Sequence, residues 1–415
     1  MIPRERLHFG AMTASGKPGL TLLLGALVAI APLAMDIYLA SMPSMTRALG
    51  ASAGMVQLTL VVYMFGWGVS QLFVGPVSDR YGRRPVLLAG LALFIVASLA
   101  CAAAGDVQTL IAARFFQALG MSAAAVVPRA VVRDLFSAER AARMLSLMGM
   151  VLGIAPVVAP LLGSHLHVWF GWQANFLFVA AYGVLAFVFA ARGLPETLRE
   201  RNPRALDPRV MLQTFAELLA SRTFVAYMLV AAFSSCGLFA FLTGSAFVFV
   251  SVMQSGETGF GLMFALVMLG NFIGAIIGSR WVMRLGISGL IRLSSWLMLA
   301  AGLAMAALAW ARVDHPLAVV VPMFLYMVSF TSTMPQATAG ALTPFPNIAG
   351  AASSLLSFCQ FVFAASAALA VGLTFDGTQR PMASAIAIAA MLTFISFRLL
   401  VPRGTAPRCR GAPPV

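Results

Sequence analysis

The sequence predicts an all-α integral membrane protein with twelve transmembrane helices in two six-helix halves. Of its 415 residues, 61% are hydrophobic and only 10% are charged, which excludes an ordinary soluble protein. The apolar residues form long runs, and a chain of this length holds about twelve runs of roughly 20 residues, each enough to cross a bilayer. A polar stretch near the middle of the chain separates six runs from six.

The first half is expected to cover residues 1–191. A basic leader containing Arg4, Arg6 and Lys17 precedes a run from about 20 to 48, which has no credible signal-peptide cleavage site and is interpreted as a retained span. The following spans are predicted near 55–76, 86–105, 108–128, 142–164 and 172–191. Residues 192–221 then form a cytoplasmic linker, in which 211–219 has helical spacing and is either a membrane-surface helix or a plain connection.

The second half is expected to cover residues 222–415. Its spans are predicted near 222–251, 258–279, 288–311, 316–336, 347–373 and 381–401, followed by a basic tail with Arg403, Arg408 and Arg410. An internal repeat supports the division, since Arg-Tyr-Gly at 80–82 has an Arg-Leu-Gly counterpart 204 positions later, at 284–286. Two related halves with a substrate site between them near the membrane midplane are a common transporter plan.

The net charge of +14 is interpreted as a topology signal. Arg47, Arg312 and Arg380 are placed outside and Arg114 within a span, which leaves 23 of the 27 basic residues on the cytoplasmic side, together with both termini. The arginines are scattered between apolar runs and form no single face, so no nucleic-acid partner is expected.

No catalytic or cofactor site is expected. Three of the four cysteines fall in apolar runs and the fourth lies in the tail, so they show no disulfide or metal-ligand pattern; they are Cys101, Cys236, Cys359 and Cys409. His165 and His167 are assigned to an external turn as interfacial residues, and no nucleotide-binding loop is present among the spans. We therefore predict no metal, no cofactor and no enzymatic activity.

The stretch GPVSDRYGRRP, from Gly75 to Pro85, is predicted to be a tight cytoplasmic turn between spans two and three. Its Gly-Pro start is expected to end the second helix, and Gly82 to permit a sharp reversal. Asp79 is expected to accept hydrogen bonds from arginines or from a helix N-terminus. The functional residues of the turn are Gly75, Asp79, Arg80, Gly82, Arg83 and Arg84; the alternative is a basic topology signal alone.

Asp36 and Arg114 are the only acidic and basic residues placed deep within spans. At about 1.5 Å per residue, Asp36 lies roughly 24 Å and Arg114 roughly 20 Å from the cytoplasmic ends of their spans, so they share one level. A carboxyl group in hydrocarbon favours its neutral form and can exchange protons, which predicts a proton-coupling pair. The two side chains are expected to be related through water or substrate, or by a contact that changes between conformations. The alternatives are an interfacial cap for Asp36 and a snorkelling arginine.

A wet cavity is predicted next to this pair. Tyr63, Trp67 and Gln71 follow one another at i, i+4 and i+8 on the second span, and Gln117 lies one helical turn from Arg114; Tyr38 completes the candidate lining. Packing between helices explains such a stripe nearly as well. Weaker candidates in the second half are Asn271, Ser353, Ser357 and Gln360.

The fifth span concentrates residues that permit close packing and a kink: Gly149, Gly153, Pro156, Pro160 and Gly163. Its GIAPVVAPLLG resembles the antiporter signature of drug-exporting major facilitators, and GPVSDRYGRRP resembles their loop between spans two and three. MDIYL, RFFQALG, RAVVRDLF, LPETL and FPNIAGAASSL extend the resemblance over most of the chain, to the bicyclomycin and chloramphenicol resistance branch. Ile154 and Ala155 separate Gly153 from Pro156, which departs from the commonest form of the signature.

This resemblance implies a proton-coupled exporter, or antiporter, of small amphiphilic drugs in a bacterial inner membrane. Its partners would be a chloramphenicol- or bicyclomycin-like drug, protons and lipid, and the chain would act as a monomer. Asp36 and Arg114 match functional positions of the family, and Asp79 lies in its conformational turn. An uptake symporter for a metabolite remains an alternative with the same fold, and a membrane receptor or enzyme is an alternative of another class.

Overall fold

The computed structural model describes residues 18–401 except 199 and 204. Within that part of the chain the regular secondary structure is helical, with no strand, which confirms the predicted fold class. The basic leader with Arg4, Arg6 and Lys17 lies outside the described residues, as does the tail. The tail residues concerned are Arg403, Arg408, Cys409 and Arg410.

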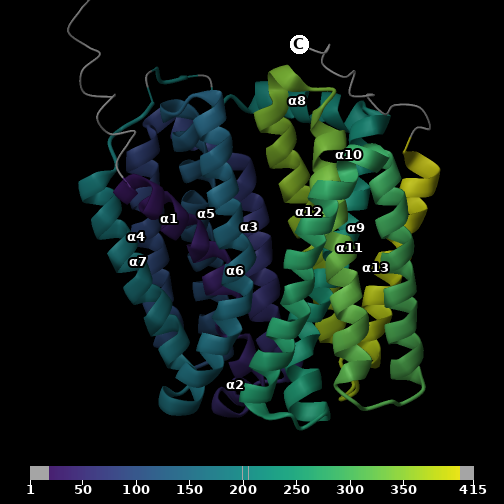
Figure 1. Cartoon of the computed structure of the whole chain (residues 1–415). Helices are drawn as coiled ribbons and strands as arrows, with labels where there is room; N and C mark the ends of the chain where they lie inside the picture. Colours follow the sequence, from purple (N-terminus) through teal and green to yellow (C-terminus); the bar gives the residue numbers. More distant parts are fainter. Residues whose placement is uncertain (1–17, 199, 204, 402–415) are drawn as a thin grey trace, which may run out of the picture. The chain divides into compact units, whose positions relative to one another are not determined.

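The helices of the first part of the chain run in long, closely packed segments (Figure 1). They are α1 (Pro18–Asp36), a 3-10 turn (Leu39–Ser41), α2 (Met42–Ala48), α3 (Ala53–Tyr81), α4 (Arg83–Ala102), α5 (Val107–Leu135), α6 (Ala138–Phe170) and α7 (Gln173–Gly193). Helix α5 packs against α3 and α4, and α1 packs against α5, α6 and α7. This packing buries one side of α1 and α5 deeply.

The remaining helices follow in the second part of the chain. They are α8 (Pro208–Ala220), α9 (Arg222–Ala246) with a π-helical extension (Phe247–Val252), α10 (Gly256–Trp310), α11 (Leu317–Leu342), a 3-10 turn (Pro346–Ile348), α12 (Ala349–Leu373) and α13 (Arg380–Leu400). Helix α9 packs against α11, α12 and α13. In α8, Leu218 is buried in a cluster with Phe224, so the helical spacing of the predicted linker does form a helix.

Eleven helical segments of the described chain are long and apolar enough to cross a membrane. One of them, α10, has 55 residues, and Gly286 within it has φ 69° and ψ 174°, which is not helical. The break divides α10 into two span-length parts, so the described chain holds twelve. Gly82, at the equivalent position of the internal repeat, also has positive φ, at 109°.

The chain divides into two compact units. Unit 1 contains the residues up to Met211 together with Phe249–Ala265, and unit 2 contains Leu212–Val248 and the residues from Leu266. The boundary falls within α8. Residues Phe249–Ala265 belong to unit 1 although the chain on both sides of them belongs to unit 2.

The turn between α3 and α4 is shorter than predicted. Helix α3 continues through Gly75 and Pro76 to Tyr81, so the prediction that Gly-Pro ends the helix is wrong. A proline costs a membrane helix one backbone hydrogen bond, and neighbouring groups can compensate for it. Gly82 alone makes the reversal, because its φ of 109° is accessible chiefly to glycine and α4 starts at the next residue.

The placement of His165 and His167 in a turn is also wrong. Helix α6 continues past both residues and ends at Phe170, and the next residue, Gly171, has a φ of 82°. An external segment without Lys or Arg can be helical or not, so the charge pattern did not show where α6 ends. Glycine with positive φ is the usual residue just beyond a helix C-terminus.

Candidate substrate and proton site

The first membrane span is interrupted at Asp36. Helix α1 ends there, residues 37 and 38 form a turn, and helical structure resumes with the 3-10 turn and α2. Pro43 at the start of α2 has no N–H to continue the helical ladder across this segment. The carboxyl group of Asp36 is 1% exposed, so the break lies inside the protein and does not place the group at the surface.

Arg114, on α5, is fully buried next to this break. Its Nη1 donates to the Ala34 carbonyl oxygen at 3.0 Å and to Gln117 Oε1 at 2.5 Å. Its guanidinium carbon lies 4.4 Å from the ring centre of Tyr38 and 3.9 Å from that of Tyr63. Two aromatic faces and a backbone oxygen therefore stabilise a charge that would be costly in hydrocarbon.

Asp36 and Arg114 are close but do not form a direct ion pair. Arg114 binds the carbonyl oxygen two residues before Asp36, yet no pairing of their side-chain oxygen and nitrogen within 4.0 Å occurs in the described chain. Asp36 Oδ1, Arg114 Nε, Arg114 Nη2 and the Tyr63 hydroxyl are buried without a hydrogen-bond partner among the described residues. Buried polar groups are almost always satisfied, so these four atoms define a site that a ligand, water or proton can complete.

A chain of hydrogen bonds fixes the orientation of the Arg114 side chain. Gln117 accepts from Arg114 and donates through Nε2 to Ser98 Oγ at 2.8 Å, and Ser98 donates to the Phe94 carbonyl at 2.6 Å. On the other side, Thr59 donates to the Val56 carbonyl, so the Tyr38 hydroxyl donates to Thr59 Oγ1 at 3.1 Å. The guanidinium is thus fixed with two of its nitrogens free to bind.

The structure brings some of the predicted cavity residues together and not others. Tyr38, Tyr63 and Gln117 contact Arg114 directly. Trp67 and Gln71 lie further along α3 and are half-buried. Of the predicted stripe on α3, Tyr63 thus belongs to the charged site.

Helix α6 packs against the break in the first span, and the contact is made at Gly163. A Cβ atom on Gly163 would overlap the Ile37 carbonyl oxygen, so the two backbones meet at the residue after Asp36. Apart from the adjoining part of α6 itself, nothing lies within 4 Å of such a Cβ atom at Gly149 or Gly153. Pro156 and Pro160 lie within the helix. Of the three glycines, only Gly163 is required here for close approach.

A second cluster of charges lies where α3 meets α4. Arg83 binds Asp79 Oδ1 at 2.5 Å, Ser78 Oγ at 2.6 Å and Asp134 Oδ2 at 3.1 Å. Asp134 also accepts from the Thr197 hydroxyl at 3.1 Å. Arg83 therefore joins the end of α3 to the end of α5, and Asp134 extends the connection to Thr197, beyond α7.

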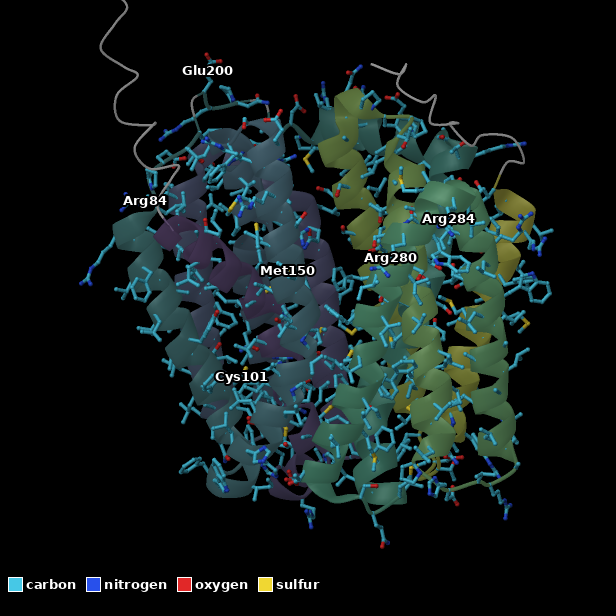
Figure 2. The ribbon with its side chains drawn as sticks, in the orientation of Figure 1. Arg84, Cys101, Met150, Glu200, Arg280 and Arg284 are labelled. Atoms are coloured by element: carbon cyan, nitrogen blue, oxygen red, sulfur yellow. The ribbon has the colours of Figure 1, made fainter. Side chains whose placement is uncertain are left out.

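Glu196 caps the start of α4. It accepts hydrogen bonds from the backbone N–H of Arg83 at 2.9 Å and of Arg84 at 3.2 Å, two donors that a helix N-terminus leaves unpaired. A negative charge is also favourable at that end of the helix dipole. Arg84 Nη2 donates to the Ala191 carbonyl, and Figure 2 shows Arg84 and Cys101 towards opposite ends of α4.

The remaining residues of the turn have other surroundings. Arg80 is exposed and stacks over the ring of Tyr81 at 5.5 Å. Gly75 lies within α3 with no neighbour near a Cβ position. In the second repeat Met283 stands where Asp79 would be and is 81% exposed. Figure 2 shows the neighbouring Arg280 and Arg284 close to each other on α10.

His167 joins α6 to the first turn of α10 within unit 1. Its Nε2 lies 2.9 Å from Glu257 Oε1 and 2.9 Å from Ser44 Oγ. A carboxylate can only accept, so Nε2 carries a proton. Gly261, one turn further on, lies close to Ser164. No group of three metal ligands occurs among the described residues.

The weaker candidates in the second half show no comparable site. Asn271 accepts a hydrogen bond from Thr331, and Gln360 lies 3.9 Å from the sulfur of Met334. Ser353 is exposed and Ser357 is half-buried. These contacts are what packing between helices requires.

Several residues of the charged site escaped the sequence analysis. Phe176, on α7, lies 5.8 Å from the guanidinium carbon of Arg114, and Ser98 and the Ala34 carbonyl complete its surroundings. A phenylalanine or serine in an apolar span carries no periodic signal. Asp134 and Glu196 lie in quoted motifs, but nothing in their spacing indicated that both reach the turn at Gly82.

The long apolar helices and the charged site between them define a membrane transporter. Residues 24–369 match the Major Facilitator Superfamily, so the chain belongs to that family. It is a multi-pass protein of the inner membrane and, like other members of the family, a transporter and not an enzyme.

Two relatives that are named as resistance proteins match most of the chain. A bicyclomycin resistance protein homolog of Haemophilus influenzae is 28% identical over 389 residues, 93% of this chain and 97% of that protein. A chloramphenicol resistance protein of Pseudomonas aeruginosa is 33% identical over 357 residues, 81% of this chain and 80% of that protein.

The fold is shared with solved transporter structures. The xylose transporter XylE from Escherichia coli, in a partially occluded inward-open conformation, superimposes with a TM-score of 0.72 at 13% identity. The match covers 92% of this chain and 97% of that one. At this identity the likeness concerns the fold alone.

Proposed function

We propose that this protein is an antiporter that exports small amphiphilic drugs, such as chloramphenicol- or bicyclomycin-like compounds, in exchange for protons. The observation that carries the proposal is the buried pair of Asp36 and Arg114, with polar atoms of both side chains unsatisfied. A buried carboxyl group can be stable both protonated and ionised only if a hydrogen-bonding or charged partner binds or leaves when its charge changes. The names of the resistance relatives support the choice of substrate.

The exchange follows from competition for one site. When Asp36 is ionised, its charge and that of Arg114 balance, and the free Arg114 nitrogens and the Tyr63 hydroxyl can hydrogen-bond to a drug. When Asp36 takes a proton, that balance is lost and its ability to accept hydrogen bonds falls, which favours drug release. Binding of drug from the cytoplasm with proton loss, then release outside with proton uptake, gives exchange driven by the proton gradient.

We propose that the other predicted residues support this cycle. Tyr38 and Gln117 hold Arg114, and Trp67 and Gln71 extend the cavity along α3. Gly163 lets α6 pack against the Asp36 break, and the other glycines and the prolines of α6 permit a local kink. The cluster at Asp79 and Arg83 stabilises one transport conformation. The protein works as a monomer of two six-helix halves, 1–191 and 222–415, with a linker at 192–221 and both termini cytoplasmic.

The test is transport by the purified protein in lipid vesicles. Vesicles with an imposed pH gradient are given chloramphenicol, and drug uptake and proton movement are recorded together. Drug and protons moving in opposite directions at a fixed ratio is the expected result. Movement in the same direction would indicate a symporter, and drug binding without gradient-driven flux would indicate a receptor; either outcome refutes the proposal.

A further inference from the structure

A cavity of about 380 Å³ opens in unit 2, apart from the charged site. It is lined by residues from the end of α10, the end of α12 and the start of α13. The lining changes character from polar, at Trp310, Asp376 and Arg380, to apolar, at Ala370 and Ile388. A cavity of this kind suits an amphiphile with a charged end.

The polar end is built around a stacked arginine. The guanidinium carbon of Arg380 lies 5.1 Å from the ring centre of Trp310, and Trp310 Nε1 donates to Ser384 Oγ at 3.2 Å, which fixes the ring. In the described residues, no hydrogen bond or ion pair of the Arg380 guanidinium with another side chain occurs. The edge of the guanidinium therefore keeps its donors for a ligand, and its planar fork matches a phosphate.

Asp376 gives the cavity a second, opposite charge. Its Oδ1 accepts from the Thr378 hydroxyl at 2.6 Å and from the backbone N–H of Thr378 at 3.0 Å, and these bonds, with the nearby charge of Arg380, lower the pKa of the carboxyl group and keep it ionised. Gln379 is 2% exposed and donates to the Val313 carbonyl at 2.9 Å, which ties this loop to the end of α10. The two charges are thus held at one rim.

The apolar end faces outward from the membrane-spanning helices. Ile388 is 52% exposed, and Ala370 and Ala385 leave a groove because their side chains are short. Trp310 is 62% exposed at the end of α10, as expected for a tryptophan at the level of lipid headgroups. An exposed apolar groove along membrane helices is covered by lipid chains, so the occupant of the cavity comes from the bilayer.

We propose that this cavity binds a phospholipid with a zwitterionic headgroup that carries a primary ammonium. Its phosphate binds Arg380, its ammonium group binds Asp376, and one acyl chain follows Ala370, Ala385 and Ile388. An anionic headgroup would satisfy Arg380 but would be repelled by Asp376. With the predicted topology, the site lies in the outer leaflet.

The test is lipid binding to the purified, delipidated full-length protein, measured by native mass spectrometry. Phosphatidylethanolamine and phosphatidylglycerol are titrated separately onto the wild type, Arg380→Gln, Asp376→Asn and a control, Arg312→Gln. Arg312 is an exposed arginine of the neighbouring loop that does not line the cavity. Thermal melting of each variant checks that it folds.

We expect the wild type to bind one phosphatidylethanolamine in preference to phosphatidylglycerol. Loss of the charge-assisted bonds in Arg380→Gln weakens binding of both lipids by about tenfold or more. Asp376→Asn removes the preference by weakening phosphatidylethanolamine and strengthening phosphatidylglycerol, and Arg312→Gln changes neither.

Two results would overturn the proposal. If neither cavity variant differs from Arg312→Gln, the lipids bind as a general annulus and not in this cavity. If glycerophosphoethanolamine, which has no acyl chains, competes at the concentrations at which the lipid binds, the occupant is a soluble phosphate compound. Should Arg380→Gln fail to fold, the reversal of preference in Asp376→Asn decides alone.

Discussion

Replacing Gly163 with alanine tests whether α6 must touch the break in the first span. The added Cβ atom would overlap the Ile37 carbonyl oxygen, and backbone cannot move aside as a flexible side chain does. Overpacking of a tight interior costs about 1–3 kcal/mol, sometimes more. Against this, alanine favours the helix over glycine by about 1 kcal/mol.

Gly153→Ala is the matched control, because it makes the same change on the same helix with no neighbour within 4 Å of the new atom. The gain in helix propensity is common to both variants, so the difference between them measures the clash. We expect Gly153→Ala to be neutral or stabilising and Gly163→Ala to lie at least about 2 kcal/mol below it, near the middle of the overpacking range.

The assay is thermal melting of both purified variants in the same detergent, followed by chloramphenicol transport in vesicles. Gly163→Ala should melt several degrees below Gly153→Ala and transport poorly, since moving Ile37 displaces Asp36. Equal melting temperatures and equal transport would refute the reasoning, because α6 would then not need close contact at Ile37.

Substitutions at three further positions address the charged groups. Asp36→Asn should still bind drug but lose uphill transport and drug-linked proton release, and wild-type proton release would exclude Asp36 as the carrier. Arg114→Ala should abolish transport, and Arg114→Lys should not restore it, because lysine cannot donate in a planar fork while stacked between Tyr38 and Tyr63; active vesicles with either variant would contradict this. Asp79→Asn should shift the balance between inward- and outward-open states by no more than about fivefold, as expected for loss of a partly exposed ion pair worth up to about 1 kcal/mol. Distances between spin labels measure that shift, and an effect confined to drug affinity would contradict the assignment.

The sequence was most informative where an ionisable residue lies within an apolar membrane span. Asp36 and Arg114 are conspicuous because ionised groups are rare in hydrocarbon, and their burial needs no knowledge of neighbours. The surroundings of Arg114 were beyond reach, since Phe176, Ser98 and the Ala34 carbonyl are set by how α4, α5 and α7 pack. Local rules failed at Pro76 for a related reason: neighbouring helices can compensate a proline, and the chain alone does not show them.

The two repeats share the same backbone turn but differ in the side-chain contacts around it. Both have a glycine with positive φ between helices, at Gly82 and Gly286, so the backbone reversal is common to them. At Gly82 the added Cβ atom would meet Glu196, and Arg83 collects Asp79 and Asp134. In the described part of unit 2, Met283 is exposed and no ion pair forms near Gly286. Moving the turn of unit 1 therefore breaks charged contacts, whereas moving the turn of unit 2 displaces an exposed methionine.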